Sequence, residues 1–172
     1  MKPKIVYLLL SFFVLSLLPP SSVYADYVLP YPGYMPGNKL YKVSRLFDKF
    51  GSYWHWGAIA SFKYYLALSD KYLVEAKTLF EYKQYLLAVD ALQRSNEHFQ
   101  RLPQLLTRVT EEEKDARKLT ARTTEAAVAH IQVLEKLKNE LPAEFTWSPE
   151  KQNATTLKLE QLLDEAMSLR KL

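Results

Sequence analysis

Residues 58–102 read AIASFKYYLALSDKYLVEAKTLFEYKQYLLAVDALQRSNEHFQRL, and this stretch decides the fold. Apolar or small side chains recur at steps of three and four from Ile59 to Phe80, and again from Tyr85 to Leu102. That spacing is typical of helices that each bury one face. Because only a few residues near Lys83 separate the two patterns, the chain must turn back there. We therefore predict an antiparallel helical hairpin.

The facing sides of this hairpin supply the predicted core. We expect one set of side chains to be buried together: Leu66, Leu73, Ala76, Ala88, Leu92 and Phe99. The segment Tyr72–Ser95 also resembles a single tetratricopeptide-like unit, although Gln100 stands where that repeat ends in proline. Such repeats stack in threes or more, and no second copy is visible. We interpret the segment as a well-packed hairpin.

The rest of the chain is predicted to be helical as well. No glycine follows Gly57, which disfavours tight strand hairpins and phosphate-binding loops. Residues 104–141 contain neither proline nor glycine, so we expect a long helix there. Residues 110–125 are almost entirely polar, and the sequence leaves open whether the helix is continuous through them. Ser148 and Pro149 would begin a last helix after a linker. The predicted fold is all-α: a helical bundle built on the hairpin, with a long helix and a C-terminal helix.

Upstream of the hairpin, the sequence predicts a helix over residues 39–50 with Asn38 as its N-cap. Its apolar residues form one stripe: Leu40, Val43, Leu46, Phe47 and Phe50. A break follows at residues 51–57 and contains Trp54, His55 and Trp56. We expect these rings to fill the core at the bend. The alternative is a binding platform, since such rings stack on sugars or lie at membrane interfaces.

The entry segment, residues 27–38, contains prolines and tyrosines and no helical period. An apolar aromatic segment is costly to leave in water, so we expect an extended strap packed near Trp54 and Trp56. The alternative is an exposed strap that grips a partner through Tyr31 and Tyr34. Together these alternatives define the candidate binding residues: Tyr31, Tyr34, Trp54, His55 and Trp56.

The first 25 residues have the order of a secretory signal peptide. Lys2 and Lys4 precede an apolar run over residues 5–18, and Pro19-Pro20 and a small residue at Ala25 follow. We predict cleavage after Ala25 and export to a periplasmic, cell-surface or secreted location, with an uncleaved anchor as the alternative. The mature chain then divides into an aromatic-rich helical domain, residues 26–103, and a more polar part, residues 104–172.

The sequence contains no recognisable catalytic motif. His55, His98 and His130 share no metal-ligand spacing, and no nucleophile motif or phosphate loop is present. We therefore predict no enzyme activity, no cofactor and no metal. Without Lys2 and Lys4 of the predicted signal peptide, the formal net charge falls from +4 to +2, and this near balance does not favour nucleic acid as a partner. One alternative is an enzyme with dispersed acid–base residues such as Asp48, His55 and Asp70.

A second alternative is an oligomer formed as a coiled coil through residues 104–141. The main hypothesis is an exported interaction or structural module. Its candidate partners are an unidentified protein and the membrane surface.

The run Leu-Pro-Tyr-Pro-Gly-Tyr-Met-Pro at residues 29–36, followed by Leu40-Tyr41 and Leu46-Phe47-Asp48-Lys49, is the most specific feature of the sequence. It resembles the opening of a bacterial domain-of-unknown-function family that occurs in exported proteins, over about residues 27–102. Gly37 and Lys39 stand where that pattern has an acidic residue and a proline. The resemblance implies a signal peptide followed by helices. It implies no activity.

Overall fold

The computed structural model describes residues 27–150 and 153–171. The predicted signal peptide and its cleavage site at Ala25 lie outside these residues. The described chain is mostly helical, which confirms the predicted helical class. Its elements follow one another as α2 (Tyr41–Phe50), the 3-10 turn η1 (Gly51–Tyr53), α3 (Ala58–Glu81), α4 (Tyr85–Phe99), α5 (Leu102–Glu111), α6 (Arg117–Glu140), β1 (Phe145–Trp147), β2 (Thr155–Leu157) and α7 (Leu159–Ser168).

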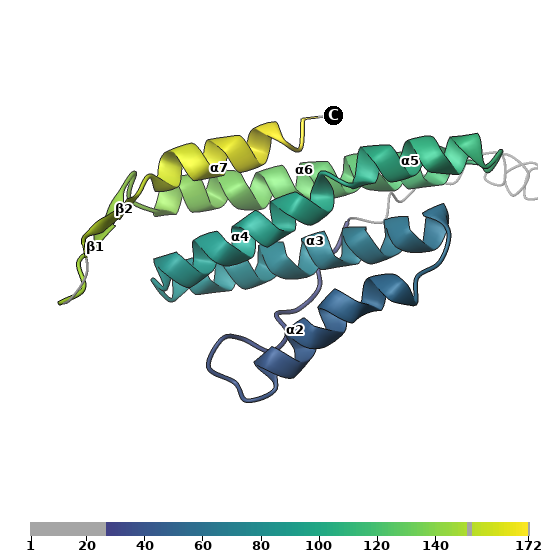
Figure 1. Cartoon of the computed structure of the whole chain (residues 1–172). Coiled ribbons are helices and arrows are strands. Elements are labelled where there is room, and N and C mark those ends of the chain that lie inside the picture. The colour runs from purple at the N-terminus through teal and green to yellow at the C-terminus, as the bar shows by residue number, and fades with distance from the viewer. Residues whose placement is uncertain (1–26, 151–152, 172) are drawn as a thin grey trace, which may run out of the picture.

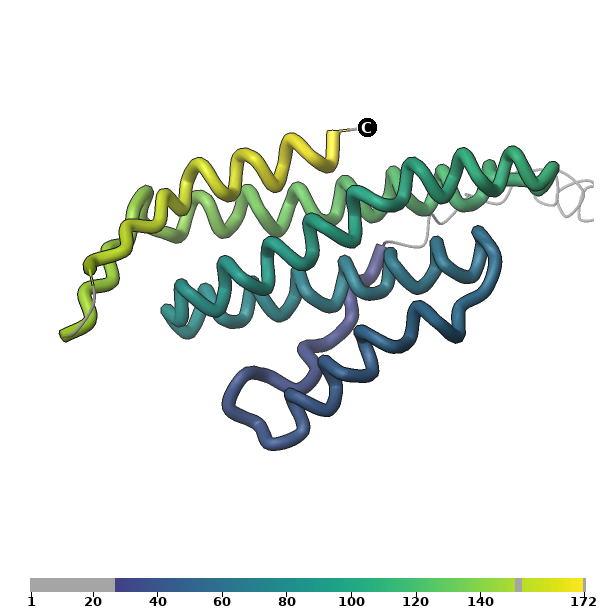
Figure 2. Tube along the Cα trace, viewed as in Figure 1, coloured from purple at the N-terminus to yellow at the C-terminus, as the bar shows by residue number. Residues whose placement is uncertain are grey.

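The helices are arranged side by side, with α2 at the outer edge (Figure 1). The chain reverses between α3 and α4, and these two helices pack against each other more extensively than any other pair. α5 continues beyond the end of α4, α6 runs back along the molecule, and α7 lies against α6. The Cα trace shows the entry segment crossing α3 before it reaches α2 (Figure 2).

The core consists of two neighbouring clusters that combine side chains from distant parts of the chain. One brings Leu73, Ala76, Ala88 and Leu92 against Leu134 of α6. The other brings Leu66 and Phe99 together with residues of α5 and α6. All six predicted core residues are therefore buried, although they are divided between the clusters. Side chains from both sides of residue 103 fill both clusters, so the two predicted parts share their core.

The long helix expected over residues 104–141 is not continuous but is divided into α5 and α6. α5 ends at Glu111, and Glu113 adopts a left-handed backbone with φ of 55°. The Lys114 amide donates to the Val109 carbonyl, and the Glu113 amide donates to the Thr110 carbonyl. This pair of bonds is a Schellman C-cap. Such caps usually contain glycine, and the absence of glycine from this segment concealed the break.

Replacing Glu113 by glycine should stabilise the protein. A left-handed backbone costs a residue with a Cβ roughly 1 kcal/mol, which glycine avoids, so we expect a gain of about 0.5–1 kcal/mol in the free energy of unfolding. Urea unfolding followed by circular dichroism measures it. The matched control is Gln132→Gly, at an exposed position in the interior of α6, which should lose about 1 kcal/mol. A loss of stability for Glu113→Gly would contradict this account of the cap.

The predicted cap at Ser148 and Pro149 is also wrong, because α7 begins at Leu159. The intervening chain forms a small antiparallel pair, in which β1 and β2 are joined through the register Thr146↔Thr156. Phe145 packs on Tyr85 of α4 at a centroid distance of 4.5 Å. The β-branched Thr155 and Thr156 favour an extended backbone over the first turn of a helix.

The entry segment packs as an extended strap, but at a different place from the one expected. Tyr27 is buried, and its hydroxyl donates a 2.6 Å hydrogen bond to Asp70. Leu29 and Met35 pack against the first core cluster. The strap therefore crosses the middle of α3 and does not lie at the bend that precedes α3.

Candidate functional site

The face of α2 that points towards α3 and α4 is polar. Tyr41 reaches back from α2 and donates a 2.7 Å hydrogen bond to the carboxylate of Glu75 on α3. Glu75 is buried, and burial raises the pKa of its carboxyl above the usual value even though the Tyr41 hydroxyl and nearby cations oppose this shift. Arg45, one turn after Tyr41, donates to the Tyr41 hydroxyl at 3.3 Å.

Asp48 provides the second polar attachment of α2. Its carboxylate forms an ion pair with Lys71 and accepts a 2.8 Å hydrogen bond from the hydroxyl of Tyr72. Lys71 also donates to Ser44 at 3.0 Å. The Tyr64 hydroxyl donates to the backbone carbonyl of Asp48. α2 is therefore fixed to α3 mainly by hydrogen bonds and an ion pair on one of its faces.

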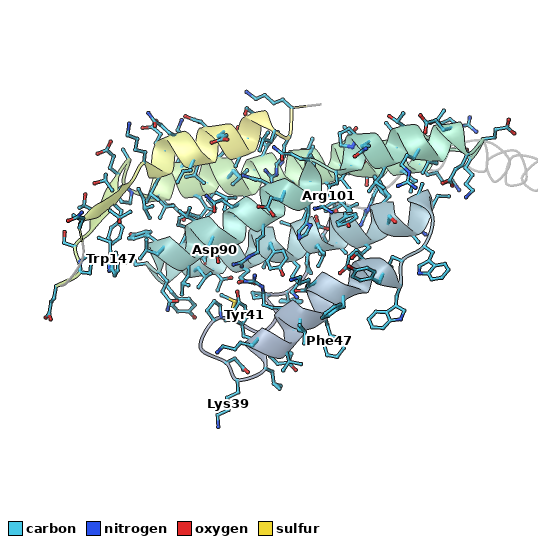
Figure 3. The ribbon with its side chains drawn as sticks, in the orientation of Figure 1. Lys39, Tyr41, Phe47, Asp90, Arg101 and Trp147 are labelled. Carbon is cyan, nitrogen blue, oxygen red and sulfur yellow. The ribbon has the colours of Figure 1, made fainter. Side chains whose placement is uncertain are left out.

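The opposite face of α2 is apolar and exposed. No residue of α2 is buried. Figure 3 shows Phe47 projecting away from the other helices, whereas Tyr41 points towards them. The predicted apolar stripe therefore exists but faces outwards, because its five residues are all exposed: Leu40, Val43, Leu46, Phe47 and Phe50. The hydrophobic effect normally turns such a face inwards, so this helix has the reverse orientation.

The exposed apolar surface continues into the turn after α2. Trp54 is 72% exposed and Trp56 is 83% exposed, so the prediction that they fill the core is wrong. The ring that packs is His55, which stacks on Tyr64 at 4.3 Å and bonds to the carbonyl of Gly51. We refer to the outward residues of α2 and this turn as the α2 surface: Leu40, Val43, Leu46, Phe47, Phe50, Tyr53, Trp54 and Trp56.

A hollow of about 420 Å³ lies beside the α2 surface, between α2 and α4. Four cationic side chains line it: Lys42, Arg45 and Lys49 of α2, and Arg94 of α4. Its acidic lining residues are Asp48, which Lys71 neutralises, and Glu97, while Arg94 is itself paired with Asp90. Lys42, Arg45 and Lys49 therefore outnumber the remaining acid, Glu97. The hollow therefore carries a net positive charge, which would attract an anionic group.

His98 also lines this hollow. Burial, followed by repulsion from Arg101, lowers the pKa of His98 to about 4, so its ring is neutral at pH 7. The ring lies between Tyr72 and Tyr65, at centroid distances of 5.6 and 5.7 Å. Its Nδ1 is shielded from solvent and has no hydrogen-bond partner among the residues that the structure describes.

The three dispersed acid–base candidates are held by different partners. Asp48 pairs with Lys71, His55 stacks on Tyr64, and Asp70 bonds to Tyr27 and to His130. Asp70 and His130 do form an acid–base pair at 2.8 Å, but the His130 side chain is completely buried. That pair offers no access to a substrate.

The other two predicted binding residues, Tyr31 and Tyr34, belong to the strap and not to the α2 surface. Tyr31 is 96% exposed and Tyr34 is 49% exposed. Lys42, Arg45 and Lys49 were not singled out from the sequence. A signal was present for Arg45 alone, because it belongs with Tyr41, Ser44 and Asp48 to a polar stripe at helical spacing opposite the apolar one.

The described residues contain neither a metal-binding cluster nor a membrane-spanning helix. In residues 27–150 and 153–171, no group of three or more His, Cys, Asp and Glu side chains is placed to hold a metal ion. Within the same residues, no helix combines the length and the apolar character that crossing a membrane requires.

Comparison with known protein families gives one match. Residues 33–144, about two thirds of the chain, fit the model of a domain of unknown function, DUF5667. The chain belongs to this family. The DUF5667 match begins inside the Leu-Pro-Tyr-Pro-Gly entry and extends through α6 into the segment before β1, further than the expected end near residue 102. No curated protein and no solved structure matches the chain.

Proposed function

We propose that this DUF5667 protein is an exported interaction module that docks through the α2 surface. One observation supports this proposal: α2 is oriented with its polar face towards the fold and its apolar face towards solvent. Eight apolar side chains of one helix face and the turn after it are exposed, and exposed apolar patches mark protein or membrane interaction sites. Export rests on the signal-like order of residues 1–25 and on the resemblance to exported proteins.

The coiled-coil alternative has less support. The apolar positions of α6 that would form an intermolecular seam are occupied inside the molecule, with Leu134 at 0% and Leu137 at 3% exposure. The enzyme alternative is weakened because Asp48, His55 and Asp70 have separate partners. A docking role requires neither a seam nor a catalytic pocket.

Cysteine accessibility tests docking in cells, since the native chain contains no cysteine. Phe47→Cys reports on the α2 surface, and Val128→Cys is the matched control, an exposed apolar position on α6. In the purified full chain, both cysteines should react with a maleimide at similar rates. In cells with an intact cytoplasmic membrane and a permeabilised envelope, an impermeant maleimide should label position 128 several-fold faster than position 47.

Two outcomes would contradict the proposal. Equal labelling of both positions in cells would mean that nothing covers the α2 surface. Labelling of position 128 only after the cytoplasmic membrane is broken would mean that the protein is not exported.

A further inference from the structure

We infer that the α2 surface docks on an anionic lipid bilayer, with the lipid phosphates bound by the basic hollow beside α2. This inference rests on the proposed docking function and names its partner. The combination of an apolar helix face with an adjacent basic face is typical of helices that lie in the membrane interface. Both faces belong to the same short helix here.

The charged residues around α2 are almost all basic. Between Tyr27 and Ser69, the sequence contains a single acidic residue, Asp48, which is turned inwards and paired with Lys71. Among the described residues, neither Lys42 nor Lys49 forms an ion pair, and both line the hollow along one flank of the apolar stripe. A bilayer with anionic headgroups complements these charges, whereas a neutral bilayer does not.

The aromatic residues of the turn support the same partner. Trp54, Trp56 and Tyr53 are exposed at the end of α2. Tryptophan and tyrosine are enriched at the boundary between water and the hydrocarbon of a membrane, because their rings are apolar and their polar groups remain hydrated. The α2 helix would lie in the membrane plane with its apolar side chains in the headgroup region.

The shape of the site also favours a bilayer. α2 lies on the outer edge of the fold and projects Phe47 away from it (Figures 1 and 3). A protein partner would need a groove to receive this protruding helix, whereas a bilayer receives it without a preformed groove. The polar attachment of α2 to Glu75 and Lys71 keeps the apolar stripe pointing outwards while the hollow stays open.

A local probe tests the inference on the full chain. The apolar run at residues 5–18 is itself attracted to lipid, so the readout must come from α2. An environment-sensitive nitrobenzoxadiazole dye on Phe47→Cys should show several-fold higher emission with vesicles containing one quarter phosphatidylglycerol, and little change with pure phosphatidylcholine. The same dye on Val128→Cys should not respond to either vesicle.

Charge variants test the role of the hollow. In the chain labelled at position 47, Lys42→Gln/Lys49→Gln should lower the affinity for phosphatidylglycerol vesicles, as measured by the dye, by roughly 30-fold. This is the expected effect of removing the attraction of two lysines to an anionic surface. The matched control, Lys118→Gln/Lys136→Gln on α6, should change this affinity little. Free glycerol phosphate should leave the dye unchanged, because a soluble phosphate supplies no bilayer.

The outcomes are separable. If position 47 is protected in cells and yet does not respond to anionic vesicles, the docking function stands but its partner is a protein, and this inference is wrong. An equal response to neutral and anionic vesicles, or an unchanged response of the Lys42→Gln/Lys49→Gln variant, would overturn the role of charge.

Discussion

Replacing Ala88 by glutamate should lower the free energy of unfolding by about 3–5 kcal/mol, because the change overpacks the core and buries a charge without a partner. Ala88 has an exposed fraction of 0% and lies in the first core cluster beside Leu73 and Ala76. At this position the methyl group allows α3 and α4 to approach closely. A glutamate side chain would have to separate the helices or remain neutral in an apolar cluster.

The control for this change is one residue away. Leu87→Glu adds a carboxylate on the same helix, but Leu87 is 43% exposed, so the charge stays in water and the loss should be below about 1 kcal/mol. Urea unfolding of both variants, followed by circular dichroism, measures the difference. Similar losses for the two variants would show that α4 does not pack on α3 through Ala88.

The sequence predicted the parts of the fold that depend on regular spacing. The three-and-four steps from Ile59 to Leu102 identify the buried faces of α3 and α4, because burial and helical period are linked directly. Spacing could not predict the ends of the helices. Lys83 and Glu113 both adopt left-handed C-cap conformations, with φ of 58° and 55°, and neither is the glycine that usually marks such a cap.

The candidate site shows a different limit of sequence reasoning. The apolar stripe of α2 was visible in the sequence, but its direction was not. A stripe is turned inwards unless the opposite face forms better contacts. Here Tyr41 and Asp48 find partners on α3 that lie 34 and 24 residues away in the sequence, at Glu75 and Tyr72. Local pattern alone does not reveal such distant pairings.

The same limit concealed the polar centre of the fold. Arg170 follows α7 in a segment that the sequence does not distinguish, yet it is 1% exposed and among the most deeply buried side chains. Its guanidinium donates to His130 Nδ1 at 3.0 Å, to Ser95 at 2.9 Å and to Asn96 at 2.7 Å. His130 Nε2 in turn bonds to Asp70. This network joins the C-terminal segment to α3, α4 and α6.

Because the Arg170 Nε always carries a proton, His130 Nδ1 must accept and His130 Nε2 must donate to Asp70. His130 is therefore neutral and lies between a cation and an anion. Burial, opposed in part by Asp70, holds the pKa of His130 below its usual value. Removal of Arg170 would leave the Asp70 carboxylate buried without its balancing charge.

Replacing Arg170 by methionine should lower the free energy of unfolding by about 3–5 kcal/mol, the range found when one partner of a buried ionic network is removed. Methionine retains most of the packing of the arginine stem, so the loss reports on the polar contacts. Lys171→Met is the matched control, because Lys171 is the next residue and is exposed, and it should cost less than about 0.5 kcal/mol. Urea unfolding at pH 8 measures both changes.

The pH dependence of this loss distinguishes the network from simple packing. In the native protein, the pKa of His130 lies below its unfolded value of 6.5, so the folded state binds fewer protons and stability falls as the pH drops below about 6.5. In Arg170→Met, the repulsion from the guanidinium is gone while the hydrogen bond to Asp70 remains, so the pKa of His130 should rise and its protonation should offset the charge of Asp70 at low pH. The loss caused by the substitution should therefore be smaller at pH 5 than at pH 8. A loss that is constant between these two values would mean that Arg170 contributes packing alone.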